Sequence, residues 1–570
     1  MVKVIKKMGE VEENQIGTIL SGSTTIEATC QLLEAAERGN VKEGMLLLIK
    51  SGERKILARV AQIVPYNEFY SEGSPWSEPI RKKLPIPEDV ARKYEICKLD
   101  LLMELPRADV RSPPQPGDPV LRLDPLKHGK EIFGVSQNDP YHIWYGSLIG
   151  YEGKAPVPLN VENLPMHMAI FGVTGSGKSF DAGVLIERLA EIPVKEGKIS
   201  YPMIIVDAHG DYTDYAKYVA NNNKLYEASW VRRYVFPKAI TLKDRTQKGT
   251  IRPIGINLDL LPQRELAEII VLYYKGTTEG AELQVDALDT LFETMKDKGY
   301  DSIQEIFLHY FRELERTLNE MPKEIISSPT KSAVRRALNS FRTIESEHKL
   351  LSTESDFQKA EISDGKVKKV QFVEEITREG GIAILDFSAE GAPGVDLKTK
   401  QLVMTYLASL LFDQFTNYKI RNEERYLLFI IEEAQNFCPD RSYPISTSLA
   451  HSKLSAIATQ GRKFGLSLCL ISQRPSFVDR IVLSMCNSFL IHRISPEDVA
   501  FVKSITGGLP SSLAAKLTTL ERGDIILCGQ MNTVPFPLLI RVAHDERKVE
   551  HTIGKTKVCE TLASLRSKSK

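Results

Sequence analysis

The chain has 570 residues, and its 74 lysine and arginine residues balance 74 aspartate and glutamate residues, so its formal charge is zero. Hydrophobic residues make up 42% and charged residues 26%, a globular composition that excludes a wholly disordered chain. The length allows about two to four domains. The charge balance excludes a uniformly basic nucleic-acid coat protein, but it leaves room for a nucleic-acid binder whose basic residues lie on one surface.

Cysteine usage and hydropathy indicate the cell compartment. The seven cysteines form no C-x-x-C pair and their number is odd, which favours free thiols over a disulfide framework or a zinc site. Residues 1–15 lack the apolar core of a signal peptide, and no stretch reaches the roughly 18 apolar residues of a membrane span. We expect a soluble, cytoplasmic protein with no membrane contact.

The first part of the chain, residues 1–145, is predicted to be rich in β-strands. Short apolar or alternating runs at 17–21, 45–50 and 55–64 are separated by turns that carry glycine and charged residues. A small barrel is the natural closure for several short strands without long helices. No catalytic group of residues is recognisable in this part.

From residue 146 to about residue 545, short apolar strands alternate with helical stretches. This alternation predicts an α/β fold whose parallel sheet is buried on both faces. Residues 262–360 interrupt it with mostly helical patterning, and residues 546–570 form a polar tail. The expected strands are the apolar runs at 166–171, 203–207, 382–387, 426–432, 467–473 and 489–492, followed by a hairpin near 524–541.

A glycine-rich motif after the first of these strands predicts a nucleotide site. It matches the P-loop pattern G-x-x-x-x-G-K-[ST], in which glycines let backbone N–H groups turn inward around phosphate oxygens. The lysine can reach the β- and γ-phosphates of ATP, and the final hydroxyl can bind Mg²⁺ at the start of a helix. The residues expected to bind nucleotide are Gly172, Thr174, Gly175, Ser176, Gly177, Lys178 and Ser179.

A second motif lies about 250 residues later, where a buried-type strand ends in Glu432 and Glu433. The first carboxylate can hold the Mg²⁺ shell, and the second can polarise the attacking water. A solvated acidic strand end is the alternative interpretation, and the P-loop upstream makes it the weaker one. The additional strand at 382–386, between the two motifs in sequence, is typical of the P-loop ATPases that include RecA-like motors.

Further short motifs accompany the P-loop and the two glutamates, and their order and spacing are informative. The full set is the P-loop, Tyr145–Gly150, Asp207–Tyr212, Glu432–Ala434, Gly461–Gly465 and Ser472–Pro475. Together these motifs resemble the HerA family, close kin of FtsK-type DNA translocases, over nearly the whole chain. The resemblance implies a RecA-like P-loop core with a helical insertion, an N-terminal HAS-like β-barrel that commonly docks a partner enzyme, and a homohexameric ring around DNA.

The resemblance and the chemistry together suggest roles for single residues. Glu432 stands where many P-loop enzymes have aspartate, and with Ser179 it is the expected Mg²⁺ ligand; Glu433 is the candidate general base. Gln473 is expected to sense the γ-phosphate, although it could be an ordinary polar strand end. Arg462 could reach the nucleotide of a neighbouring subunit, or it could be a salt-bridged residue at a helix end, and Arg474 shares both interpretations.

Some weaker sequence patterns allow both a functional and a structural interpretation. Asp207, His209 and Asp211 could orient water or metal, but turn formation explains the spacing equally well. Arg522 and Gly523 resemble a family turn that approaches nucleotide, or they simply enter a hairpin. Two positions depart from the family: Gln435 stands where relatives often have histidine, and Met166 stands where some carry arginine.

The favoured hypothesis is a ring-forming ATPase that uses ATP and Mg²⁺ to translocate on or unwind double-stranded DNA threaded through a basic pore. It would act in DNA end processing or antiphage defence with an effector docked on the barrel face, such as a NurA-like nuclease, another nuclease or a NADase. One alternative is an ATP-dependent scaffold that assembles and regulates such an effector. A conjugation- or secretion-type motor is a second alternative, disfavoured by the missing membrane span.

Overall fold

The protein is described from a computed structural model. The structure describes residues 14–33, 41–67, 82–83, 94–136, 139–222, 224–241, 250–276, 280–363, 366–444 and 447–550. The expected tail from residue 551 onward lies outside the described residues. The chain forms two compact units, Met1–Val161 with Phe489–Glu546 and Glu162–Ser488 with Arg547–Lys570. The domain boundaries expected at residues 145 and 545 stay a prediction.

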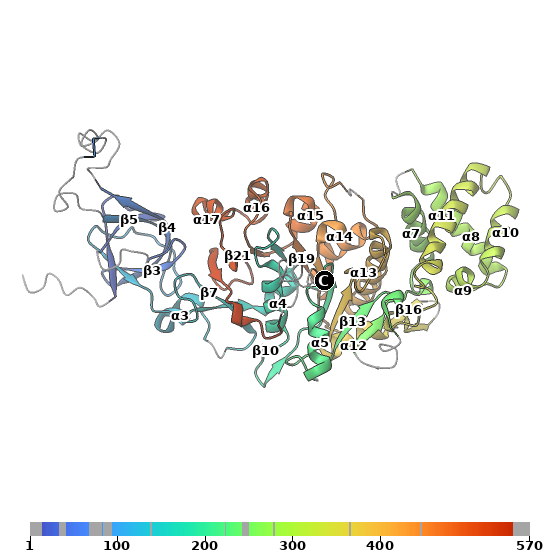
Figure 1. Cartoon of the computed structure of the whole chain (residues 1–570), viewed down its shortest axis with the longest axis horizontal. Helices are drawn as coiled ribbons and strands as arrows, with labels where there is room; N and C mark the ends of the chain where they lie inside the picture. Colours follow the sequence, from blue (N-terminus) through green and yellow to red (C-terminus); the bar gives the residue numbers. More distant parts are fainter. Residues whose placement is uncertain are drawn as a thin grey trace, which may run out of the picture. The chain divides into compact units, whose positions relative to one another are not determined.

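The first unit contains the expected small barrel. Six strands close on themselves in the order β1-β2-β5-β4-β3-β6, coloured in blue tones in Figure 1. Closure pairs the outer strands β1 and β6 with each other, which removes the free edges that an open sheet would expose. The strands are β1 (Gln15–Ile19), β2 (Glu27–Leu32), β3 (Leu46–Ser51), β4 (Arg54–Tyr66), β5 (Tyr94–Glu104) and β6 (Pro119–Arg122).

The same unit contains an antiparallel ladder in the order β21-β22-β7-β8. The apolar runs near 524–541 form the hairpin β21–β22, and β22 then pairs with β7. Short helices flank the ladder in sequence. The elements are β7 (His142–Leu148), β8 (Pro156–Asn160), β21 (Asp524–Gly529), β22 (Leu538–Arg541), α3 (Pro125–Phe133), α16 (Val499–Ile505) and α17 (Ser511–Lys516).

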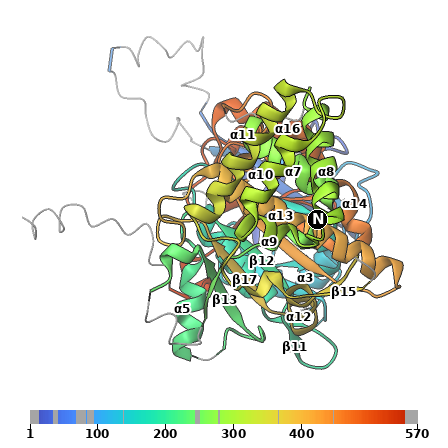
Figure 2. The same cartoon turned by 90° about the vertical axis from the view of Figure 1, so that its right-hand side faces the viewer.

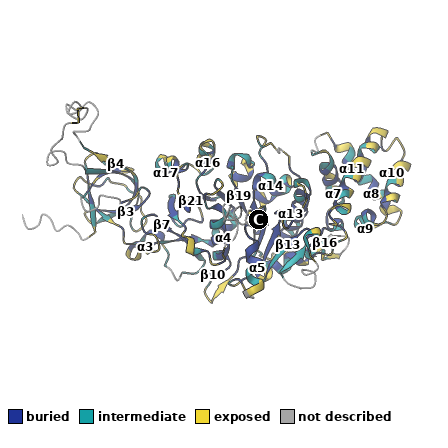
Figure 3. Cartoon of the chain, in the orientation of Figure 1, coloured by how far each residue is buried: buried dark blue, intermediate teal, exposed yellow. Residues whose placement is uncertain are grey.

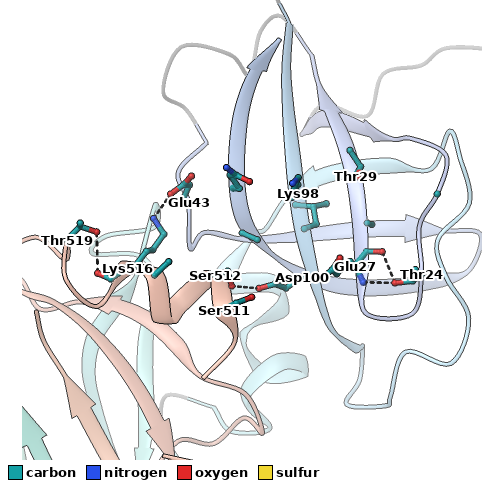
Figure 4. A pocket seen from close by; sticks show the side chains of 16 residues that line it. Thr24, Glu27, Thr29, Glu43, Lys98, Asp100, Ser511, Ser512, Lys516 and Thr519 are labelled. Atoms are coloured by element: carbon teal, nitrogen blue, oxygen red, sulfur yellow. Dashed lines mark hydrogen bonds and ion pairs between the residues drawn. The ribbon is translucent and has the colours of Figure 1, made fainter. Parts of the chain in front are cut away.

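A polar groove of about 690 Å³ lies within the first unit, between the barrel strands and α17 (Figure 4). Lys516 on α17 forms an ion pair with Glu43, and the Ser512 hydroxyl donates to Asp100 Oδ2 at 2.8 Å. The fully buried Arg59 contacts the same Asp100 carboxylate at 2.7 Å. Charged contacts therefore hold α17 against the barrel wall.

The second unit is built on a parallel sheet in which seven strands run in the order β14-β13-β17-β12-β18-β19-β9. Every residue of the five strands from β17 to β9 is buried, as expected for a parallel sheet that helices cover on both faces; buried residues are dark blue in Figure 3. The strands are β9 (Met168–Phe171), β12 (Met203–Asp207), β13 (Val231–Val235), β14 (Ile251–Pro253), β17 (Ile382–Asp386), β18 (Leu427–Glu432) and β19 (Leu466–Ser472).

Sequence order did not give the order of strands in space. The strand that separates β9 from β18 is β19, whereas β17, which lies between the two motifs in sequence, pairs with β12 and β13. Helical crossovers carry the chain past its neighbours, so consecutive strands need not be adjacent. The arrangement is still the RecA-like one with an additional strand, and it confirms the expected α/β class. The helices are α4 (Lys178–Leu189), α5 (Thr213–Asn222), α12 (Gln371–Glu379), α13 (Leu397–Ile420), α14 (His451–Gln460) and α15 (Arg480–Ser484).

The insertion expected at 262–360 is helical, as predicted. Its helices pack on one another through Leu288, Leu291, Leu314 and Phe341, which are fully buried, and they are grouped together in Figure 2. None of the helices described, here or elsewhere in the chain, is long and apolar enough to cross a membrane. The insertion consists of α7 (Gln263–Lys275), α8 (Glu282–Asp297), α9 (Ile303–Leu308), α10 (Phe311–Glu320) and α11 (Ser328–Ser346).

Candidate ATPase site

The P-loop joins the buried strand β9 to the first turn of α4. Gly175 and Gly177 have φ angles of +79° and +103°, in the region that side chains rarely adopt, so glycine is required at both positions. The Gly172 N–H donates to Ser472 O at 3.2 Å, which fixes the start of the loop to β19. Lys178, the first residue of α4, is only 6% exposed. The loop can therefore present backbone N–H groups and a lysine to a phosphate group.

Glu432 is the last residue of β18 and is fully buried. Its Oε2 accepts from the Ala208 N–H at 3.0 Å, and the Ser179 hydroxyl donates to its Oε1 at 3.5 Å. Burial raises the pKa of Glu432 to about 7, although the nearby Lys178 opposes the rise. A buried carboxylate beside a hydroxyl, with its charge incompletely offset, fits the oxygen ligands that Mg²⁺ prefers.

Glu433 follows in a left-handed turn with φ of +50°. Its carboxylate accepts from Gln473 Nε2 at 2.6 Å and from Gln435 Nε2, and it lies 3.4 Å from His209 Nε2. Burial would raise its pKa, but the hydrogen bond from His209 and the charge of Lys178 outweigh burial and leave the pKa below its usual value. Glu433 is thus held ionised and ready to accept a proton.

Gln473 connects the P-loop to Glu433. It accepts from the Thr174 hydroxyl at 2.7 Å through Oε1, and its Nε2 donates to Glu433. Gln435, which departs from the family pattern, takes part in the same network: the Ser472 hydroxyl donates to its Oε1 at 2.9 Å while its amide holds Glu433. Sequence patterns did not predict this contribution, because Gln435 reaches Glu433 only through the turn after β18.

The segment after β12 combines a turn with a contact to the site. Asp207 is fully buried and accepts from the N–H groups of Gly210, Asp211 and Tyr212 at 2.6 to 2.9 Å, so its carboxylate builds the turn. His209 instead reaches Glu433, and that hydrogen bond raises the pKa of His209 to about 8. The structural interpretation holds for Asp207, whereas His209 belongs to the site.

The family described as Helicase HerA, central domain, matches residues 143–411. The chain is 25% identical over 545 residues to the DNA double-strand break repair helicase HerA of Sulfurisphaera tokodaii, covering 94% of both chains. It is 25% identical over 552 residues to the Sulfolobus acidocaldarius protein of the same name, again covering 94% of both. The chain is similar to these HerA helicases along nearly its whole length. It is an ATP-hydrolysing enzyme.

Solved structures with similar folds include VirB4 of Thermoanaerobacter pseudethanolicus, with a TM-score of 0.45 and 16% identity over 73% of this chain and 100% of that one. The plasmid coupling protein TrwB in complex with ADP and Mg²⁺ aligns with a TM-score of 0.42 and 15% identity, over 73% of this chain and 98% of that one.

The remaining predicted residues are Arg462, Arg474, Arg522 and Gly523. Arg462 is exposed in the turn Gly461–Phe464 after α14, and the Arg474 guanidinium lies 4.7 Å above the Phe477 ring. Arg522 is exposed just before β21 in the other unit, and Gly523 accepts from the Val542 N–H at 3.0 Å. Roles for Arg462, Arg522 and Gly523 in nucleotide contact stay predictions.

Proposed function

We propose that this chain is a ring-forming ATPase that hydrolyses ATP in the presence of Mg²⁺ to translocate on or unwind double-stranded DNA. The observation that carries the proposal is the grouping of Lys178, Ser179, Glu432 and Glu433 at one edge of a RecA-like sheet. Two relatives that match along 94% of the chain are named DNA double-strand break repair helicases, which supports DNA as the track.

Nucleotide binding would use the P-loop and the start of α4. Gly172, Thr174, Gly175, Ser176 and Gly177 would surround the phosphates with backbone N–H groups, and Lys178 would lie against the β- and γ-phosphates. Ser179 and Glu432 would hold Mg²⁺, which neutralises charge on the phosphates when it is bound.

Hydrolysis would centre on Glu433. Water attacks the γ-phosphorus, its proton passes to the Glu433 carboxylate, and the bond to the ADP oxygen breaks. Gln473 touches both Thr174 of the P-loop and Glu433, so it is placed to respond to the γ-phosphate and to adjust Glu433. The hydrogen bond from His209, which lowers the pKa of Glu433, would favour its ionised form before the attack.

The ring is proposed to be a homohexamer with double-stranded DNA in its pore. Six copies repeat each pore lysine or arginine, so a basic lumen is compatible with a chain of zero net charge. Arg462 would reach the nucleotide of the neighbouring subunit, where a guanidinium offsets charge on the transferred phosphoryl group.

An effector is proposed to dock on the barrel face: a NurA-like nuclease in DNA end processing, or a nuclease or NADase in antiphage defence. Among the described residues, the side chains that contact Glu433 are Gln435, Gln473 and His209, and none of them belongs to the barrel.

The proposal is tested by purifying the chain with the product of its neighbouring gene, measuring the mass of the native assembly, and assaying ATP hydrolysis with and without duplex DNA. We expect a six-fold assembly whose hydrolysis rises with duplex DNA and stops in Lys178→Ala. Hydrolysis that continues in Lys178→Ala would overturn the assignment of the site. Hydrolysis that ignores DNA would favour an ATP-dependent scaffold over a motor.

A further inference from the structure

A short C-terminal segment, residues 547–549, packs against the helix that begins with the P-loop lysine. The backbone N–H groups of Lys548 and Val549 donate to the Glu187 carboxylate on α4, at 2.8 and 3.0 Å. Glu187 is 1% exposed and also accepts from the Tyr226 hydroxyl at 2.9 Å. We call residues 547–549 the C-terminal strap.

Arg547 of the strap fills the space between α4 and the segment that starts α5. Its guanidinium lies 5.1 Å above the Tyr215 ring and 5.9 Å from the Phe180 ring. A Cβ on Gly183 would lie 2.7 Å from the guanidinium carbon, so a larger residue at this point of the helix would displace the Arg547 side chain. The Tyr215 hydroxyl donates to Gly183 O at 2.8 Å, so α5 is also hydrogen-bonded to α4 at this position.

The guanidinium also reaches the turn after β12. Arg547 Nη2 donates to the backbone oxygen of Asp211 at 3.4 Å. That turn includes Ala208, whose N–H holds Glu432, and His209, which holds Glu433. One side chain therefore touches both halves of the candidate site, the helix that carries Lys178 and Ser179 and the turn that supports the two carboxylates.

Arg547 carries a charge into a buried position, and the need to fill space does not by itself explain why an arginine is there. The side chain is 6% exposed, and its Nε and Nη1 have no hydrogen-bond partner among the described residues. An aliphatic side chain of similar length would fill the space without the cost of desolvating a cation. The guanidinium adds a directed hydrogen bond to Asp211 O, contact with two aromatic faces and a charge opposite to that of Glu187.

We propose that the C-terminal strap is a positioning device for the ATPase site: Arg547 sets the distance between Ser179 on α4 and Glu432 on β18. The inference rests on the proposed shared role of these two residues in holding Mg²⁺. Their oxygens are 3.5 Å apart, and a shift of α4 away from the turn would separate them while leaving the P-loop backbone intact.

The test is the gain in ATP affinity that Mg²⁺ provides, measured as the ratio of dissociation constants for a fluorescent, slowly hydrolysed ATP analogue without and with Mg²⁺. In Arg547→Met we expect this gain to fall about 10-fold or more, because loss of support around a metal site typically costs 10- to 100-fold in metal affinity. The affinity without Mg²⁺ should stay within about 3-fold of wild type, and Arg547→Lys should recover part of the gain.

Gly183→Ala provides a second route to the same displacement, because its methyl group would collide with the guanidinium. We expect Gly183→Ala to reproduce the Arg547→Met result, and the double variant to be no worse than either single variant, since both remove one interaction. The matched control is Arg188→Met, which removes a half-buried cation from the same helix.

An unchanged Mg²⁺-dependent gain in both Arg547→Met and Gly183→Ala would overturn the positioning role. Equal losses in Arg188→Met would do the same, because they would show a general sensitivity of α4. A wild-type chain that binds the analogue without any help from Mg²⁺ would instead contradict the proposed function.

Discussion

At the scale of single residues, the neighbouring carboxylates Glu432 and Glu433 have opposite electrostatic environments. Burial raises the pKa of Glu432 to about 7, whereas His209 and Lys178 bring the pKa of Glu433 below its usual value. Two adjacent glutamates therefore suit two tasks: the first gains most from a bound cation, and the second stays ionised as a proton acceptor. Divergent pKa values of paired carboxylates commonly mark such a division of roles.

Replacing Glu433 with glutamine should separate binding from hydrolysis. Glu433→Gln removes the proton acceptor but leaves the P-loop unchanged, so we expect hydrolysis to fall about 10²- to 10⁴-fold while ATP affinity stays within about 3-fold of wild type. Single-turnover hydrolysis and equilibrium nucleotide binding measure the two effects. Loss of nucleotide binding in Glu433→Gln would argue against its role as the base.

Buried His167 predicts a pH dependence of stability. The His167 side chain is 2% exposed, its Nε2 lies 3.0 Å from Ala458 O, and its Nδ1 accepts from the Leu468 N–H at 3.0 Å. Burial lowers the pKa of His167 from 6.5 to about 4. Because the folded state binds the proton less tightly than the unfolded state, stability is complete above about pH 6.5 and is lost as the pH falls from 6.5 toward 4.

At pH 5 we expect this histidine to reduce the free energy of unfolding by about 2 kcal/mol relative to pH 7.5. Thermal unfolding of wild type and His167→Gln at both pH values isolates the contribution of His167 to this decrease, because glutamine can keep both hydrogen bonds without titrating. The same decrease in the two proteins would show that His167 does not cause it.

At the scale of secondary-structure elements, a buried ion pair joins the neighbouring strands β13 and β17 of the parallel sheet. Arg233 on β13 donates to Asp386 at the end of β17 through Nε at 2.8 Å and Nη2 at 2.5 Å. The two side chains are 12% and 0% exposed. Removing one partner would leave the other charge buried and uncompensated.

Arg233→Met should therefore destabilise the protein by about 3 to 5 kcal/mol. The control is Arg264→Met, whose ion pair with Asp286 joins side chains that are 60% and 56% exposed and which should change stability by less than about 1 kcal/mol. Denaturant unfolding monitored by circular dichroism compares the two variants. Equal effects would mean that the Arg233–Asp386 pair contributes no more than a surface pair.

At the scale of the whole molecule, the proposed ring makes a complementation experiment possible. In separate preparations, Lys178→Ala and Arg462→Ala should both be inactive. When the two are mixed before assembly, about one quarter of interfaces in a random ring would combine an intact Lys178 with an intact Arg462, so part of the activity should return. Titrating one variant into the other and measuring ATP hydrolysis gives the readout.

Recovery on mixing would place Arg462 in trans. If activity stays absent and Arg462→Ala also lowers the melting temperature, Arg462 supports the helix end of its own chain, which is the alternative interpretation of this exposed residue.

The sequence by itself determined the local parts of this protein. Barrel strands, apolar core strands, the helical insertion and the P-loop each follow from short-range patterns: alternation, apolar runs, helical spacing and the spacing of glycines. Glu432 and Glu433 were recognisable for the same reason, because carboxylates at the end of a buried strand form a contiguous signal.

Only the tertiary structure decided which of these parts contact one another. It placed β19 rather than β17 beside the P-loop strand, gave Gln435 and His209 their contacts with Glu433, and brought the strap from the far end of the chain onto α4. Such contacts join residues as far apart as Glu187 and Val549, and they depend on crossovers and packing that no local pattern encodes. The zero net charge remains compatible with DNA for the same reason, because in the proposed ring only the folded assembly would decide which charges face the pore.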